Sequence, residues 1–144
     1  MSTPTHSQAA ALRTAIDTLM RRFKIAESEV SDGKHLNQID MQVMLYVSAH
    51  EACGPTDIAR PLGVAPTTIT SATDRLARHD YLRRERPEED RRAIALRLTP
   101  AGESYVSNLI DVQTDHCRMM LDALSGKDQD TLIRLISTIA KNED

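Results

Sequence analysis

Residues 54–103 read GPTDIARPLGVAPTTITSATDRLARHDYLRRERPEEDRRAIALRLTPAGE and contain two helical segments followed by a hairpin. Gly63 marks a tight turn between the two helices, because glycine readily accepts the left-handed backbone that ends a helix. Pro66 stands where a first helical residue is preorganised. After Tyr81, apolar and charged residues alternate on both sides of the acidic stretch 87–90, which predicts an antiparallel hairpin. This order of elements is typical of a helix-turn-helix with a wing.

The segments around this stretch are helical, because their apolar residues recur at steps of three and four. They predict a helix over 5–31 that Gly33 ends, a central helix that ends near Ala52, and two helices in 100–142. Within the quoted stretch, Thr56 is the expected N-cap of the first short helix. The fold class is therefore mainly α with a small β-hairpin wing. One winged helix-turn-helix lobe is expected over 36–99, with its recognition helix at about 66–79 and its wing at about 82–98.

Charge is distributed unevenly along the chain, whose formal net charge is −3. Residues 54–102 hold nine Arg, no Lys and seven acidic residues, so this segment is positive while the remainder of the chain is negative. Arginine suits planar, bidentate contacts to phosphate or guanine better than lysine does. From charge alone, a solvated face with internal Arg–acid pairs explains the same pattern equally well.

Composition excludes several classes of protein. No apolar run approaches the roughly 20 residues that span a bilayer, and the N-terminus lacks the pattern of a secretory signal, so a cytoplasmic protein without a membrane partner is expected. Three Tyr, one Phe and no Trp disfavour a binder of single-stranded nucleic acid, which stacks bases on aromatic side chains. Two cysteines do not make a disulfide framework.

Two motifs in the quoted stretch are specific. The first is D-R-R at 90–92, followed by an alternating strand and L-T-x-x-G at 98–102, and the second is T-x-x-x-D-R-L at 70–76. With these motifs the segment resembles the DNA-binding core of MarR-type transcriptional regulators. Asp80 departs from the glycine that is common there, so the helix end must turn without glycine. Ser71 departs from a frequent basic residue.

The resemblance implies a homodimer, in which the N- and C-terminal helices over 5–31 and 100–142 interlock as dimerisation helices. It implies a winged helix-turn-helix bound to a palindromic operator in double-stranded DNA. Such a protein is usually a repressor that a ligand or oxidation relieves. Less favoured alternatives are a protein-interaction module whose Arg-rich hairpin binds an acidic partner, and a small helical enzyme.

The candidate DNA contacts lie on the recognition helix and on the hairpin. On the helix they are Thr67, Thr68, Thr70, Ser71 and Arg75. Neighbouring residues of a helix do not face each other, so Arg75 is expected to reach DNA while Asp74 pairs elsewhere. On the hairpin an arginine can enter a narrow minor groove, with Asp90 orienting it; the candidates are Arg84, Arg86, Arg91 and Arg92. Ordinary helix-start chemistry is the alternative for the hydroxyl residues.

Other polar residues suggest regulation only weakly. A small aromatic or anionic effector is expected near the junction of the lobe and the dimerisation helices, where the candidates are His35, Tyr46, His50 and His116. Cys53 and Cys117 are candidate redox thiols, although a small buried hydrophobe is the commoner role of such a residue. No metal-ligand spacing and no catalytic motif occurs, so no metal, no cofactor and no enzymatic activity are expected.

Overall fold

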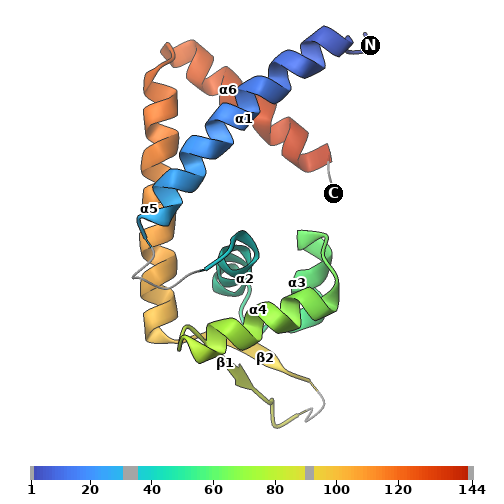
Figure 1. Cartoon of the computed structure of the whole chain (residues 1–144), viewed down its shortest axis with the longest axis vertical. Coiled ribbons are helices and arrows are strands. Elements are labelled where there is room, and N and C mark those ends of the chain that lie inside the picture. Colours follow the sequence, from blue (N-terminus) through green and yellow to red (C-terminus); the bar gives the residue numbers. More distant parts are fainter. Residues whose placement is uncertain (1, 31–35, 90–92, 143–144) are drawn as a thin grey trace. The chain divides into compact units, whose positions relative to one another are not determined.

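The computed structural model describes residues 2–30, 36–89 and 93–142, and its helices and strands follow the order expected from the sequence (Figure 1). This confirms the mainly α fold with a small hairpin. The elements are α1 (His6–Ser28), α2 (Gln38–Ala49), α3 (Pro55–Leu62), α4 (Pro66–Arg78), β1 (Leu82–Glu85), β2 (Ala95–Leu98), α5 (Pro100–Asp122) and α6 (Gly126–Asn142).

The chain divides into two units, which are described separately. The terminal unit comprises residues 1–27 and 111–144, and the lobe comprises residues 28–110. The lobe is longer than the 36–99 expected from the sequence because the first three turns of α5 belong to its core, where Tyr105, Val106 and Leu109 are buried.

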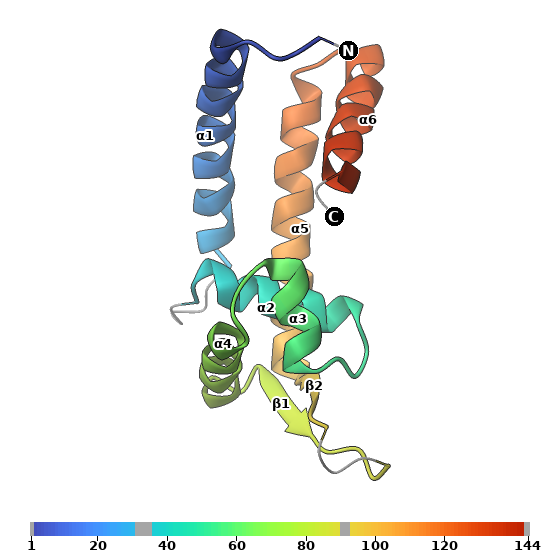
Figure 2. The same ribbon diagram turned by 90° about the vertical axis from the view of Figure 1, so that its right-hand side faces the viewer.

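The core of the lobe forms around α2, which is apolar on most sides and contributes Val43 and Met44 with no exposed surface. α4 packs against α2, α3 and β1 (Figures 1 and 2). The inward residues of α3 are Ile58 and Ala59, as the sequence indicates. These contacts fix α4 on one side and leave its other side exposed.

The turn between α3 and α4 has the geometry that its glycine predicts. Gly63 adopts φ 66° and ψ 32°, and its N–H donates to the carbonyl of Arg60 at 3.1 Å. The start of α3 differs from expectation, since the helix begins at Pro55 and its N-cap is Gly54 rather than Thr56. Asp57 explains the earlier start, because its carboxylate accepts the Gly54 N–H at 2.8 Å and Pro55 fits the first helical position.

The hairpin pairs β1 with β2 in antiparallel register, with Leu82 opposite Leu98 and Arg84 opposite Leu96. Leu82 and Leu96 face the core, whereas Arg83 and Arg84 are exposed. The N–H of Leu96 also donates to the carbonyl of Cys53 at 2.8 Å, which ties β2 to the segment between α2 and α3. The hairpin is thus anchored at its base, and its residues 90–92 lie outside the described part.

The end of α4, the hairpin and the start of α5 meet at one junction. Asp80 adopts φ 61°, so the chain does turn there without glycine, as expected; aspartate tolerates this left-handed region better than most residues. The Thr99 hydroxyl donates to the Asp80 carbonyl at 2.5 Å and accepts the Gly102 N–H at 3.0 Å. Thr99 therefore caps α5 and holds the end of α4, which gives the L-T-x-x-G motif a structural role.

The terminal unit contains α1 up to Glu27, the second half of α5 from Asp111, and α6. None of the residues described in α6 is buried. Phe23 of α1 meets His116 of α5 edge-on with ring centroids 5.2 Å apart. Large apolar side chains are exposed along the helices of this unit, namely Leu12, Ile16, Leu19, Met20, Ile25, Met119, Ile133, Leu135, Ile136 and Ile139. Within the described ranges, no helix is long and apolar enough to cross a membrane.

Candidate nucleic-acid interface

The exposed side of α4 is a stripe of short polar residues. Thr67, Thr70 and Ser71 are exposed, Thr68 is half-buried, and the residues between them that face the core include Ile69 and Ala72. We call the exposed side chains Thr67, Thr70, Ser71, Asp74 and Arg78 the outer face of α4. Their spacing of three and four residues places them on one side of the helix. The structure thus exposes three of the four hydroxyl candidates together.

Arg78 belongs to this outer face but was not among the residues singled out from the sequence. It follows Ser71 by seven residues, which is two helical turns, so helical spacing alone could have found it. Arg60 on α3 is a second exposed arginine that the sequence reasoning left aside. Both carry a full charge on the surface of the lobe.

Arg84 on β1 makes intramolecular contacts with α4. Its Nη2 donates to the Thr73 hydroxyl at 2.9 Å and pairs with the carboxylate of Asp74. Thr73 in turn donates to the Thr70 carbonyl at 2.9 Å. Asp74 therefore pairs away from Arg75, as expected, and Arg84 fastens the base of the hairpin to α4.

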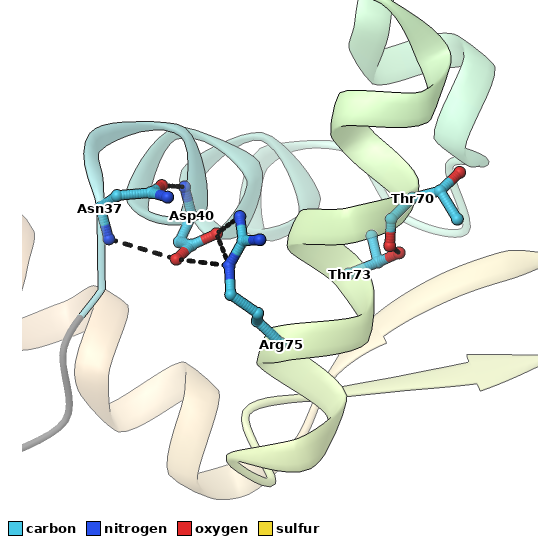
Figure 3. Close-up of polar contacts among 5 residues, drawn as sticks. All are labelled: Asn37, Asp40, Thr70, Thr73 and Arg75. Carbon is cyan, nitrogen blue, oxygen red and sulfur yellow. Dashed lines mark hydrogen bonds and ion pairs between the residues drawn. The ribbon is translucent and has the colours of Figure 1, made fainter.

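Arg75 does not extend from the outer face of α4, contrary to expectation. Its guanidinium reaches back to α2, where Nη2 lies 2.9 Å from Asp40 Oδ1 and Nε lies 3.3 Å from both carboxylate oxygens (Figure 3). The Arg75 side chain is 34 % exposed, whereas that of Asp40 is 1 % exposed. The hydrogen bonds that Arg75 donates to Asp40 raise the pKa of the guanidinium above its usual value. The arginine is held inside the lobe by an ion pair.

Asp40 is the partner that sequence reasoning missed. It occupies the third position of α2, where its N–H donates to Asn37 Oδ1 at 2.8 Å and its Oδ2 accepts the Asn37 N–H at 3.2 Å (Figure 3). This reciprocal pair is a capping box. The spacing Asn37-x-x-Asp40 was a visible signal for the cap, but nothing in the sequence links it to Arg75.

The remaining arginines of the described hairpin also contact acidic residues or other groups. Arg83 lies 3.1 Å from Glu85, and Arg97 bonds to Glu85 at 2.6 Å and reaches Glu51 at 3.5 Å. Glu85 is the main cause that raises the pKa of Arg97. Arg86 is exposed at the end of β1 and has contacts of its own. The candidates Asp90, Arg91 and Arg92 lie outside the described residues.

Two of the four effector candidates come together in the lobe. The rings of Tyr46 and His50 stack with centroids 3.9 Å apart and an interplanar angle of 13°. They line an open pocket of about 610 Å³ that Arg60 also borders. His116 belongs to the terminal unit, and His35 lies outside the described residues.

The two cysteines differ in environment. Cys53 is buried, and burial together with the nearby charge of Asp57 raises the pKa of its thiol. A redox-sensing thiol needs the opposite, a lowered pKa and exposure. Cys117 on α5 is exposed. Over residues 2–30, 36–89 and 93–142, no group of three His, Cys, Asp or Glu side chains is arranged to hold a metal ion.

Comparison with known proteins shows which family part of the lobe resembles. Residues 36–94 match the model of the MarR family. The chain is 29 % identical over 129 residues to YpoP of Bacillus subtilis (strain 168), an uncharacterised HTH-type transcriptional regulator, covering 88 % of this chain and 92 % of that protein. It is 29 % identical over 128 residues to the HTH-type transcriptional regulator PecS of Dickeya dadantii (strain 3937), covering 89 % and 72 %.

The fold is also found in solved structures. Streptococcus pneumoniae FabT, crystallised in complex with DNA, superimposes with a TM-score of 0.82 over 95 % of this chain and 96 % of that chain, at 19 % sequence identity. A MarR family protein from Bacillus stearothermophilus gives a TM-score of 0.80 at 15 % identity, covering 98 % and 99 %. At these identities the structures show a common fold.

Proposed function

Because residues 36–94 match the model of the MarR family, we propose that this protein is a MarR-type, sequence-specific transcriptional repressor that binds double-stranded DNA. The observation that carries the proposal is the outer face of α4, where short hydroxyl side chains are exposed while the opposite side is fixed in the core. The relatives named above are transcriptional regulators, so the proposed activity is binding and not catalysis.

In this proposal α4 enters the major groove, where each base pair presents a distinct pattern of donors and acceptors. Thr67, Thr70 and Ser71 approach base edges, and the charge of Arg78 meets phosphate. Thr68 is half-buried and serves at the edge of this contact. Arg75 and Arg84 act differently from the sequence-based expectation, since both hold α4 in place through Asp40 and Asp74.

The hairpin is proposed to contact the neighbouring minor groove. Arg86, Arg91 and Arg92 are the candidates for this contact, because a narrow minor groove has an enhanced negative potential that attracts arginine. Asp90 would orient one of these arginines, since a carboxylate close to phosphate would be repelled. The rigid attachment of β1 to α4 through Arg84 supports this arrangement.

The DNA-binding proposal predicts a particular operator and a steep salt dependence. When duplexes that bind the protein are selected from a random pool, an inverted repeat should be enriched. Its half-sites should lie about 10 bp apart, or a multiple of that spacing. Affinity for the selected duplex should fall about 10³-fold or more between 50 and 200 mM salt, because several arginines displace counterions from phosphate. A flat salt response, or a selection that enriches no sequence, would contradict the proposal.

We also propose that the protein acts as a homodimer through the terminal unit. Large apolar side chains are exposed on α1 and α6, including Ile16, Met20, Ile136 and Ile139. Exposed apolar patches of this kind mark interaction surfaces. A two-fold symmetric dimer also presents two lobes to the two halves of a palindrome.

Substitutions on α6 test the proposed dimer. The double variant Ile136→Glu/Ile139→Glu should sediment as a monomer at micromolar concentration, because two buried carboxylates per subunit would oppose association. Ser137→Glu changes the charge on the polar side of the same helix and should remain dimeric. A wild-type chain that sediments as a folded monomer under these conditions would rule the dimer out.

We propose that a small effector binds in the pocket of the lobe. The stacked pair of Tyr46 and His50 offers an aromatic platform, and Arg60 borders the same pocket with a positive charge. This combination suits a small aromatic acid. His35 and His116 stay candidates from the sequence alone. For oxidation, the exposed Cys117 is the better candidate of the two thiols.

A further inference from the structure

The Asp40 carboxylate is held in place by contacts at the start of its own helix, independently of α4. It is buried, and it lies at the N-terminus of α2, where the helix dipole favours a negative charge. One of its oxygens accepts the backbone N–H of Asn37 at 3.2 Å, and its own N–H is taken by the Asn37 side chain. The carboxylate therefore has little freedom to move toward a partner.

Arg75 meets this fixed carboxylate with two nitrogens. Nη2 and Nε both lie within hydrogen-bond distance of Asp40, so the planar guanidinium approaches the carboxylate side by side (Figure 3). Bidentate pairs of this kind restrict both distance and orientation. The apolar contacts of α4 are non-directional by comparison. The ion pair therefore determines how far α4 can slide or rotate on α2.

The second side of α4 is held by the hairpin. Asp74, the residue before Arg75, pairs with Arg84 of β1, and Thr73 accepts a further hydrogen bond from the same guanidinium at 2.9 Å. Residues 73–75 are thus held from two directions, by α2 and by β1. The outer face of α4, which carries Ser71 and Arg78, is set by these two attachments.

The pair also decides what Arg75 can do. A buried carboxylate that loses its cationic partner is costly, because its charge stays out of water. Arg75, which is one third exposed, could otherwise turn outward toward phosphate. The buried charge of Asp40 keeps it inside the lobe.

We infer that Asp40 is a positioning residue for DNA recognition, which fixes the recognition helix through Arg75 and withholds the Arg75 guanidinium from DNA. The inference rests on the proposed DNA-binding function and assigns a role in it to a residue of α2 that does not lie on the outer face. Sequence preference should then be lost when the Asp40 charge is removed, while electrostatic attraction to any DNA should hold or increase because Arg75 is released.

The test uses Asp40→Asn, which keeps the shape of the side chain and removes its charge. Affinities of the full chain are measured by fluorescence anisotropy for the selected operator and for a scrambled duplex of equal length. The ratio of the two affinities should fall at least tenfold. Affinity for the scrambled duplex should hold or rise, and its slope against log salt should steepen by about 0.9 for each phosphate that the freed Arg75 reaches.

A double variant separates the two parts of the inference. In Asp40→Asn/Arg75→Gln the salt slope should return to the wild-type value, because no free guanidinium remains, while the affinity ratio stays low. Val47→Ala is the control, since it removes buried apolar volume from the same helix two turns away from Asp40. It should change both affinities by the same factor and leave their ratio unchanged, as a purely structural defect would.

The results distinguish a failure of the inference about Asp40 from a failure of the proposed DNA-binding function. A folded Asp40→Asn protein with the wild-type affinity ratio would overturn the inference. If that variant does not fold, Arg75→Lys replaces it, because lysine keeps the ion pair but loses the bidentate geometry, and an unchanged ratio there would overturn the inference equally. A wild-type protein without preference for any duplex would instead remove the proposed function itself.

Discussion

Gly102→Ala is expected to unfold the lobe or leave it barely stable. A Cβ at this position would lie 2.1 Å from the carbonyl oxygen of Tyr81 and 3.0 Å from the carbonyl carbon. This oxygen cannot easily move, because it accepts the N–H of Thr99 at 3.1 Å. The expected loss in the free energy of unfolding is about 4 kcal/mol or more, which is exceptional for a single substitution and a large share of the stability of a domain.

Gly126→Ala provides the matched control for this glycine. Gly126 also stands in the first turn of a helix, but a Cβ there would meet no atom within 4 Å. Its effect on the free energy of unfolding should stay within about 0.5 kcal/mol. Equilibrium denaturation in urea measures both variants. Equal midpoints for Gly102→Ala and the wild type would show that the close approach of α5 to Tyr81 is not needed for folding.

Features that depend on local backbone geometry were predictable from the sequence. Gly63 and Pro66 define the turn and the start of α4 because each favours a particular backbone conformation in any context. The hairpin follows from the alternation on both sides of its acidic tip. The turn without glycine at Asp80 followed from the resemblance, in which a glycine is common at that position. The N-cap of α3 was placed two residues late, since the helix begins at Pro55 and the Asp57 carboxylate accepts the N–H of Gly54.

Features that depend on tertiary pairing were not predictable. Arg75 and Asp40 are 35 residues apart, and they meet only because α4 packs against α2. From the sequence alone, Arg75 is an arginine on the recognition helix without a visible acidic partner, so it was predicted to contact DNA. Arg84 was assigned to DNA for the same reason, although it bonds to Thr73 and Asp74. Counting charged residues therefore overestimates how many are available to DNA.

Ser71→Glu is expected to weaken operator binding at least 100-fold. Ser71 is exposed on the outer face of α4, so the new carboxylate would be carried into the major groove beside the phosphates. Like charges brought together at an interface cost several kcal/mol, and a 100-fold loss corresponds to about 2.7 kcal/mol. Because the side chain is exposed, the free energy of unfolding should hardly change.

The most direct test of the account compares this variant with Ser107→Glu on the selected operator. Ser107 is also exposed and helical, on α5, and its replacement makes the same change in net charge. Anisotropy titrations at one salt concentration should show a loss of at least 100-fold for Ser71→Glu and less than threefold for Ser107→Glu. Equal losses for the two variants would mean that only net charge matters, and no loss for Ser71→Glu would show that the outer face of α4 does not contact DNA.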